Sequence, residues 1–173
     1  MQIFSFSPFG YEGALVAVEV DLRRGIPAVD VVGLADGAVK ESRERMRSAI
    51  RNSGFEFPLE RVLISLSPAD LRKEGAGFDL AIALAVLDAK KMLGQNECGL
   101  QSESGEANPL CIQPDSVPVL VMGELELSGL IRPVRGVHAA AATAAAAGIT
   151  HCIVSAANGD EAREVGGMRV FAA

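Results

Sequence analysis

Apolar and polar positions follow helical and strand periods along this chain, and the clearest helical stretch runs from Asp36 to Pro58. Asp36 can cap the first turn of a helix, and Gly54 followed by the apolar Phe55 is typical of a helix end. At about 100° per residue, one side of this helix collects small and apolar residues, namely Val39, Ser42, Met46, Ala49 and Ile50. The stretch therefore predicts an amphipathic helix that packs one face on a core.

A row of basic side chains lies beside this apolar face. It consists of Lys40, Arg43, Arg47 and Arg51. Like charges four residues apart repel weakly in an isolated helix, whereas Glu41 and Arg45 form a favourable pair. Such a row is typical of a solvated face whose arginines pair with neighbouring carboxylates, and it also fits a docking surface for an acidic partner, a neighbouring subunit or the phosphates of DNA. Both interpretations stay open.

Segments with alternating polarity predict β-strands on both sides of this helix. They are residues 2–7, 14–22 and 26–33 before the helix, and residues 60–67 after it. The first three are close in sequence and separated by short turns, so we expect them to form an antiparallel meander.

Residues 80–87 are apolar at every position, which predicts a helix that passes through the middle of the fold. The loop before it contains Lys73, Gly75 and Gly77, and it is a candidate anion or oxyanion site because it offers amides at a helix N-terminus. The same glycines are expected if the loop merely enters a buried helix tightly. No GxxxxGK[ST] or GxGxxG sequence occurs in the chain, so this is not a phosphate-binding P-loop. Asp79, in the first turn, favours the helix dipole.

The C-terminal half begins with a polar segment, residues 94–118, which has no period and predicts a mobile surface loop. After it the pattern predicts a hairpin over residues 119–134, an alanine-rich helix over 136–147, a strand at 152–155, a short helix from Asn158, which caps it, and a strand at 168–171. The order of elements predicts an α+β fold of the two-layer α/β kind, in which helices pack on a mixed β-sheet.

Composition limits what this fold can do. The chain has 173 residues and 49% hydrophobic content, which suits one domain over residues 1–173. Its net charge of -6 should repel nucleic acid and anionic membranes, so the basic helix would act locally. There is no long apolar run and no signal-type N-terminus, and we expect a cytoplasmic protein without membrane partners. The three cysteines, Cys98, Cys111 and Cys152, have no metal-ligand spacing and are an odd number, so no metal site or disulfide framework is expected.

Three blocks of this sequence resemble a known family. They are VVGLADGAVKESRERMRSAIRNSGFEFP, SLSPADLRKEGAGFDLAIALAVL and GELELSGLIRPVRGV. In order and content they are similar to the N-terminal domain of the ComM/YifB family, the magnesium-chelatase ChlI-like proteins. The resemblance implies a fold like that of the Lon proteolytic domain and of ribosomal protein S5 domain 2. It also implies that an AAA+ ATPase domain, absent from this chain, would use ATP and Mg²⁺ in a ring, expected to be a hexamer, linked to DNA branch migration in natural transformation. Nothing in the sequence supports porphyrin metalation.

The resemblance to Lon permits a test for catalysis, because a Lon-type protease needs a serine nucleophile and a lysine base. Laid against the family, the serine position falls at Gly77 and the lysine position at His138. Neither catalytic group is present. His138 is expected to be an ordinary helix residue, and His151, at the start of a strand, has no identifiable partner.

Two function classes follow. The first, which we prefer, is a non-catalytic assembly and interaction domain attached to an AAA+ motor, with its basic helix facing DNA or a neighbouring subunit. The second is a peptidase with atypical groups, for example Ser65, Ser67 or Asp79 acting with Lys73. A stand-alone partner-binding domain is the remaining alternative, if the chain acts without a motor.

Overall fold

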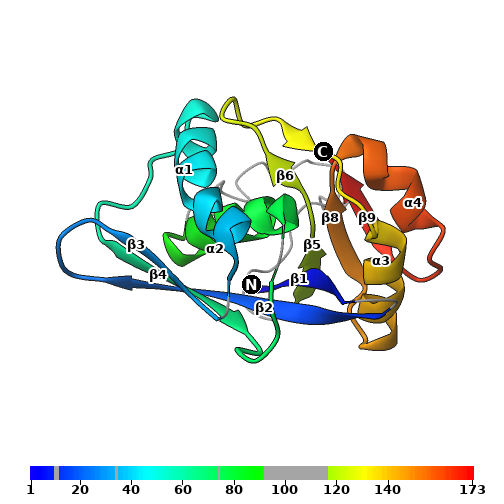
Figure 1. Ribbon diagram of the computed structural model, residues 1–173. Helices are drawn as coiled ribbons and strands as arrows, with labels where there is room; N and C mark the ends of the chain where they lie inside the picture. Colours follow the sequence, from blue (N-terminus) through cyan, green and yellow to red (C-terminus); the bar gives the residue numbers. More distant parts are fainter. Residues whose placement is uncertain (10–11, 34, 74, 92–116) are drawn as a thin grey trace, which may run out of the picture.

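The computed structural model describes residues 1–9, 12–33, 35–73, 75–91 and 117–173. Its main feature is a seven-stranded mixed sheet with the strand order β3-β4-β2-β1-β5-β8-β9, and a two-stranded hairpin, β6-β7, stands beside it (Figure 1). Helices pack on the sheet, so the predicted α/β fold class is confirmed. The predicted mobile loop, residues 94–118, lies outside the described residues except for its last two positions.

The elements follow the alternation seen in the sequence. The strands are β1 (Gln2–Phe9), β2 (Glu12–Arg23), β3 (Val29–Val32), β4 (Arg61–Ser67), β5 (Pro118–Val121), β6 (Glu124–Leu125), β7 (Ile131–Arg132), β8 (His151–Val154) and β9 (Arg169–Ala172). The helices are α1 (Gly37–Asn52), α2 (Asp79–Ala89), α3 (Val137–Ala146) and α4 (Gly159–Arg163), and the 3-10 turns η1 (Ala76–Phe78) and η2 (Ala156–Asn158) lead into α2 and α4.

The predicted meander of the first three strands is wrong for β3. β1 and β2 are antiparallel neighbours, but β4 lies between β2 and β3, and β3 runs parallel to β4. The reason is the connection: α1 joins β3 to β4 as a crossover, and a crossover helix places two strands side by side in parallel. The longer β4 then pairs with β2 on its other edge, with Val18 opposite Leu66.

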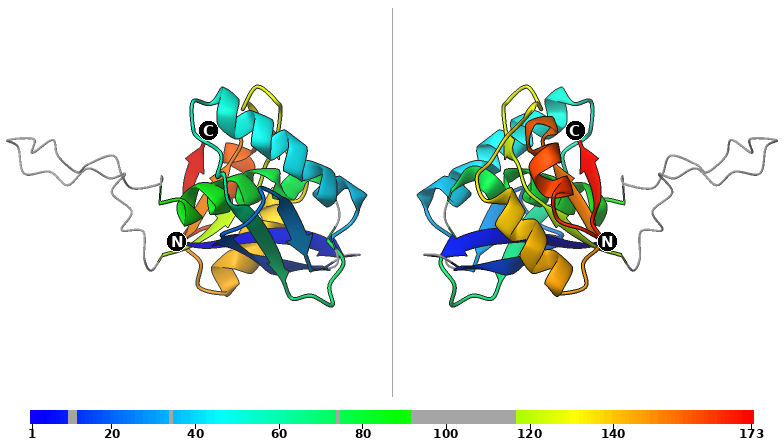
Figure 2. Two further views of the ribbon diagram at one scale, coloured as in Figure 1. Left: turned by 90° about the vertical axis from the view of Figure 1, so that its left-hand side faces the viewer. Right: turned by 90° about the vertical axis from the view of Figure 1, so that its right-hand side faces the viewer.

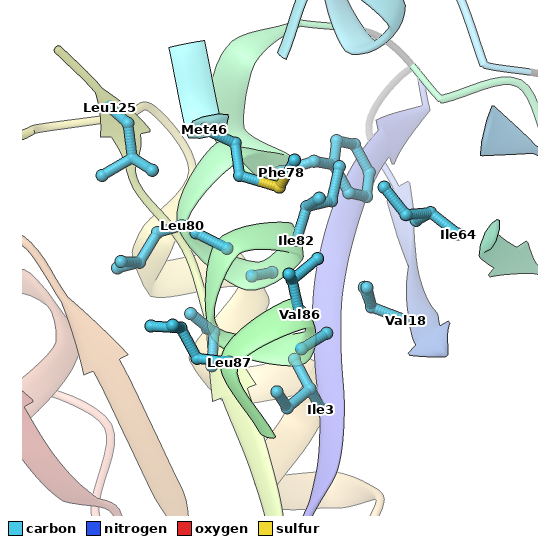
Figure 3. Close-up of a cluster of buried hydrophobic side chains, with 14 of the residues drawn as sticks. Ile3, Val18, Met46, Ile64, Phe78, Leu80, Ile82, Val86, Leu87 and Leu125 are labelled. Atoms are coloured by element: carbon cyan, nitrogen blue, oxygen red, sulfur yellow. The ribbon is translucent and has the colours of Figure 1, made fainter. Parts of the chain in front are cut away.

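The helices divide between the two faces of the sheet. Figure 2 shows α3 on the opposite side of the sheet from α1 and α2. On the first face, α1 and α2 close a core that includes Met46, Phe78, Ile82, Val86 and the sheet residue Ile64 (Figure 3). On the second face, α3 and α4 cover a smaller cluster around Leu120 and Cys152.

Helix α1 has the ends that the sequence predicts. The Asp36 carboxylate accepts a hydrogen bond from the Val39 amide at 2.8 Å, and Gly54 adopts a φ of 83° just beyond the last turn. Its predicted apolar face is buried: Val39, Ser42, Met46, Ala49 and Ile50 are all at most 3% exposed. Local chemistry therefore fixes both the limits and the orientation of this helix.

The first strand of the hairpin predicted over residues 119–134 is divided into β5 and β6. β5 leaves the sheet at Gly123, whose carbonyl accepts a hydrogen bond from the Leu80 amide and whose amide donates to the Gly77 carbonyl. A side chain at this position would meet Ile131, since a Cβ atom would lie 2.8 Å from its Cγ2. Gly123 thereby ties the start of the β6-β7 hairpin to the start of α2.

No helix in the described part of the chain has both the length and the apolar character needed to cross a lipid bilayer.

Candidate functional site

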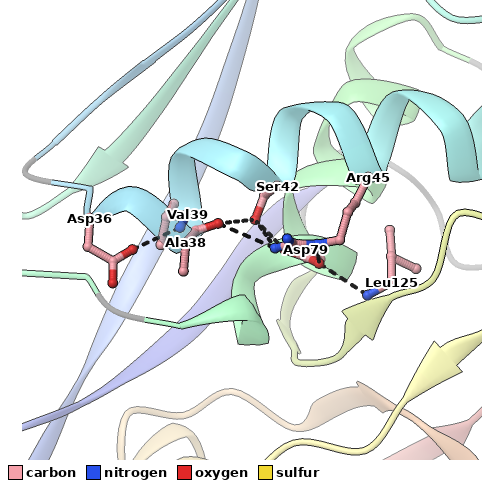
Figure 4. Close-up of polar contacts among 7 residues, drawn as sticks. All are labelled: Asp36, Ala38, Val39, Ser42, Arg45, Asp79 and Leu125. Carbon is pink, nitrogen blue, oxygen red and sulfur yellow. Dashed lines mark hydrogen bonds and ion pairs between the residues drawn. The ribbon is translucent and has the colours of Figure 1, made fainter.

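The most concentrated polar chemistry lies where α1 crosses the start of α2, around the carboxylate of Asp79 (Figure 4). Asp79 is completely buried, and its two oxygens accept hydrogen bonds from three residues on two elements, α1 and β6. Arg45 of α1 donates from Nε at 2.7 Å and from Nη2 at 3.1 Å, Ser42 donates its hydroxyl, and the Leu125 amide of β6 donates at 3.2 Å. We call Ser42, Arg45 and Asp79 the polar hub.

The polar hub is electrostatically matched. The hydrogen bonds from Arg45 to Asp79, and the opposite charge of that carboxylate, raise the pKa of the Arg45 guanidinium, against a lowering by burial. A carboxylate buried with an arginine, a hydroxyl and an amide is fully partnered, which avoids the large penalty of an isolated buried charge. The hub can therefore hold α1, α2 and β6 together, but its carboxylate is not presented to a substrate.

The role of Asp79 differs from the one expected from sequence. Its first-turn position is confirmed, yet its oxygens bond to Arg45 rather than serving the helix dipole alone. Arg45, which the sequence predicts to pair with Glu41, reaches Asp79, and Glu41 adds only a weaker charge interaction. One feature of the sequence pointed to this contact. Arg45 lies one turn beyond Ser42, at the border of the buried face, and a charge at such a position needs a buried partner.

Gly77, at the expected nucleophile position, lines a cleft of about 320 Å³ between η1 and the segment after β7. The cleft is also lined by Phe6, Met122, Glu124, Val134 and Arg135, among others. A Cβ atom on Gly77 would have only Val134 Cγ1 nearby, at 4.0 Å, so a side chain would fit. The position is open and carries no nucleophile.

His138, at the expected base position, is not among the residues that line this cleft. It lies in the first turn of α3 with its side chain 55% exposed, and its Nδ1 is 3.6 Å from a Glu164 oxygen. Its amide donates to Glu161 at 3.0 Å. The structure therefore does not bring Gly77 and His138 together across one cavity.

The loop of Lys73, Gly75 and Gly77 uses its polar groups within the fold. Lys73 is fully buried and donates from Nζ to the Pro68 carbonyl, and burial lowers the pKa of its ammonium. The Gly75 amide lies 3.4 Å from an Asp36 oxygen, and the Gly77 carbonyl accepts from Gly123. The Lys73 ammonium is turned into the protein rather than toward solvent.

The alternative peptidase residues are also placed apart. Ser65 and Ser67 lie on β4, where they alternate with Ile64 and Leu66 of the buried face and so point to the other side of the sheet. The buried ammonium of Lys73 bonds to a carbonyl, and Asp79 bonds to Arg45 and Ser42. The structure brings none of these candidate serines into a hydrogen bond with Lys73.

The basic row on α1 is not uniform. Arg43 is half-buried and donates to the Val29 carbonyl of β3 at 3.2 Å, and the Arg47 guanidinium lies over the Phe57 ring, 5.1 Å from its centre. Arg51, in the last turn, is exposed. Lys40 belongs to the same helix, but its side chain lies outside the described part of the structure. Of the three arginines in the row, Arg51 is thus the one best placed to meet a partner.

Asn158 was expected to cap α4, and that expectation is wrong. It occupies the residue before the helix but makes no capping bond. Its side-chain oxygen accepts from the Val134 amide at 2.9 Å, and its side-chain nitrogen donates to the Val134 carbonyl at 3.0 Å. The amide of Asn158 therefore pairs with the backbone just after β7 as a neighbouring strand would.

Metal and thiol chemistry find little support in the described residues. No group of three or more His, Cys, Asp or Glu side chains among them is arranged to hold a metal ion. Cys152 is buried, which raises the pKa of its thiol to about 12 and disfavours the reactive thiolate. Cys98 and Cys111 lie outside the described residues.

The fold and site define a class: an α/β domain with an internal polar hub and an open cleft that carries no nucleophile at its glycine turn. Within that class the family is clear, because residues 18–158 match the family described as subunit ChlI of Mg-chelatase. The chain belongs to this family.

Individual relatives agree with that assignment. YifB of Escherichia coli is 37% identical over 158 residues, and an uncharacterized protein of Mycobacterium tuberculosis is 38% identical over 167 residues. These matches cover 91% and 96% of this chain but 28% and 30% of the relatives. The competence protein ComM of Haemophilus influenzae is 43% identical over 91 residues, which are 53% of this chain and 18% of that protein. The chain therefore spans less than a third of the length of these relatives.

Proposed function

We propose that this chain is a non-catalytic assembly and interaction domain of a longer magnesium-chelatase-like AAA+ ATPase. The observation that carries the proposal is the cleft at Gly77, whose lining, within the part of the chain that the structure describes, includes no Ser, Thr, Cys, Lys or His. A hydrolytic site of the serine–lysine type needs a nucleophile and a base within hydrogen-bond reach. With neither group in the cleft, the fold serves as a scaffold, and its useful surfaces are those that meet other chains.

The ATPase chemistry would reside in another part of the longer protein. The 173 residues contain no GxxxxGK[ST] sequence, and the one glycine loop that leads into a buried helix bonds internally through Gly75 and Lys73. These residues do not fit a nucleotide or its Mg²⁺ ion, so no step of ATP hydrolysis is assigned to them. Their part is to position the motor through self-association, in a ring that we expect to be a hexamer.

A role in DNA handling is the finer part of the proposal. The competence protein ComM is a relative, which supports a function connected with DNA uptake, and we propose branch migration of DNA by the complete ring. Helix α1 contributes a rigid platform, since Asp36 caps it and the polar hub fastens its middle. Its exposed Arg51 then faces either DNA phosphate or an acidic surface of the next subunit.

Arg51→Glu in the full-length protein tests this surface. We expect weaker ring assembly in sedimentation velocity, or weaker binding of branched DNA in a salt series, because a charge reversal repels an anionic partner. Arg24→Glu is the matched control, since Arg24 is an exposed arginine in the turn between β2 and β3. If Arg51→Glu changes neither assembly nor DNA binding relative to Arg24→Glu, the α1 surface is not the interface.

Peptide hydrolysis provides the test of the non-catalytic assignment. The purified chain should not cleave an unfolded casein substrate, and Lys73→Met should leave that result unchanged. If the unmodified chain hydrolyses casein and Lys73→Met abolishes that activity, the protein is a peptidase that uses Lys73 and the assembly proposal is wrong.

A further inference from the structure

An apolar groove opens between α1, α2 and the β6-β7 hairpin, away from the polar hub. Its volume is about 210 Å³, and its walls are apolar side chains of all three elements together with Phe55. Phe55 is 40% exposed, and Leu127 and Leu130 of the hairpin turn are 56% and 66% exposed. We call this the leucine groove. Its lining residues from α2 are Leu80, Ala83, Leu84 and Leu87.

The sequence of α2 favours an additional cover over the leucine groove at one position, Leu84. Residues 80–87 are apolar on every side, and a helix of this kind is expected to be buried all round. The sheet covers one side of α2, and α1 and β6 cover others, with Met46 and Leu125 in contact with the same core. The side that bears Leu84 remains half-exposed.

The groove is a built feature rather than a loose gap. The hairpin turn packs against the last turn of α1 so closely that a Cβ atom on Gly129 would lie 2.3 Å from Ser53 Oγ. The Asn52 side chain also donates to the Leu127 carbonyl at 2.6 Å, which fixes the turn at the groove's edge. The exposed Leu127 and Leu130 are therefore held in place on the turn that carries the lining residue Gly129.

We infer that the leucine groove receives an apolar segment from the remainder of the same polypeptide in the longer protein. This rests on the proposed function, in which the chain is one domain of such a protein. Two observations favour this occupant. The matched region is only 28–30% of the length of YifB and of the mycobacterial relative, so a large part of each lies outside it. The described chain also ends on the same side of the molecule as the hairpin and the C-terminal end of α1, as the views of Figures 1 and 2 show.

Carbene footprinting with mass spectrometry tests the inference. The 173-residue chain and the full-length protein from the same reading frame are labelled side by side at several concentrations. We expect several-fold less labelling of Phe55 and Leu84 in the full-length protein. Ile26, which is 86% exposed in the turn between β2 and β3, is the internal control and should be labelled equally in both.

A pair of variants makes the test independent of core damage. Leu130→Glu in the full-length protein should restore labelling at Phe55, because Leu130 lies between the lining residues Gly129 and Ile131 and a charge there opposes an apolar occupant. Its matched control, Ile26→Glu, should leave Phe55 protected. Both positions are exposed, so neither change should unfold the domain.

Four outcomes overturn the inference. The first is equal labelling of Phe55 in both proteins, and the second is continued protection of Phe55 in Leu130→Glu. The third is protection in the 173-residue chain that grows with concentration, which would identify a second copy as the occupant. The fourth is a reading frame that closes after Ala173. Sedimentation of the same samples separates the two proposals. If the full-length protein assembles but its groove is still labelled, only the proposed occupant of the groove is wrong. If the groove is protected but the protein does not assemble, only the proposed assembly function is wrong.

Discussion

A buried polar side chain holds each end of the β6-β7 hairpin through hydrogen bonds, and the two side chains differ in charge. At the first end, the Asp79 carboxylate accepts from the Leu125 amide on the face of the sheet covered by α1 and α2. At the second end, the Asn158 amide bonds to both backbone groups of Val134 from the side of α3 and α4. The contact made by Asp79 is charged, whereas the contact made by Asn158 with Val134 is neutral.

The difference sets how much each fastening depends on its surroundings. Asp79 is stable in the interior only because Arg45, Ser42 and Leu125 all donate to it, so that loss of one partner affects the rest. Asn158 pairs with a backbone segment as a strand would, and it leaves no charge behind when removed. The charged end should therefore be the more sensitive one.

Asp79→Ala is expected to have the largest effect. It leaves Arg45 without its carboxylate and the buried Leu125 amide without its acceptor. Breaking a buried ion pair in this way costs about 3–5 kcal/mol of unfolding free energy. Urea denaturation followed by circular dichroism measures the loss. Asp79→Asn, which keeps the shape and an acceptor, should lose less, and a loss below that of the asparagine variant would show that Asp79 does not hold the hub.

Asn158→Ala breaks the neutral end. The hydrogen bonds to Val134 and to Glu161 are lost, but the Glu161 carboxylate still accepts from the His138 amide, so we expect a smaller loss of about 1–3 kcal/mol in the same denaturation experiment. Asn158→Asp should not rescue it at neutral pH, because an ionised carboxylate cannot donate to the Val134 carbonyl and would face Glu161. A full rescue by aspartate would show that only the bond to the Val134 amide matters.

Both fastenings join residues that are far apart in the sequence, and this is where prediction from sequence fails. The caps and buried face of α1 follow from Asp36, Gly54 and the helical period, all within one segment. Arg45 and Asp79 are 34 residues apart, and Asn158 and Val134 are 24 apart. Periodicity tells which face of an element is buried, but it does not tell which element lies opposite, so the partner of Arg45 could not be read from the pattern.

The cleft at Gly77 shows the same limit of prediction from sequence. The resemblance to Lon placed the two catalytic positions at Gly77 and His138, and the first does line a cleft. Whether the second faces it depends on how α3 is set on the sheet, and the structure pairs His138 with Glu164 instead. The position of β3 was mispredicted for a related reason, since strand order depends on the crossover through α1 rather than on the alternation within β3.

Lys73 is a third kind of buried polar group, a cation that donates to the Pro68 carbonyl, and it sharpens the contrast with Asp79. Burial lowers the pKa of its ammonium below the ordinary 10.5. Lys73→Met removes the charge, and we expect the unfolding free energy at pH 7 to be unchanged or raised by about 1 kcal/mol. A clear loss of stability in Lys73→Met would show that the bond to Pro68 outweighs the burial of the charge.

The unfolding free energies of the unmodified protein and of Lys73→Met should depend differently on pH, and the sign of the difference follows from the lowered pKa of Lys73. Below the pKa of Lys73 in the folded chain, the side chain is protonated in both the folded and unfolded states, and the full penalty of burying the ammonium is present. As the pH rises through that pKa toward 10.5, the folded chain loses the proton first, so the penalty fades. The unfolding free energy of the unmodified protein should therefore rise relative to that of Lys73→Met in this window, and a parallel pH dependence would show that the pKa is not lowered.

Gly77→Ser should have the smallest effect on stability and gives the sharpest test of the cleft. A side chain fits there, with Val134 Cγ1 at 4.0 Å as the nearest contact, so the change in unfolding free energy should stay within about 0.5 kcal/mol. Casein hydrolysis should remain absent, because the described residues that line the cleft include no lysine or histidine to take the serine proton, and His138 points to Glu164. Activity gained by Gly77→Ser and lost again in Gly77→Ser/His138→Ala would show that His138 can reach the cleft, and that the fold retains a working base opposite an empty nucleophile position.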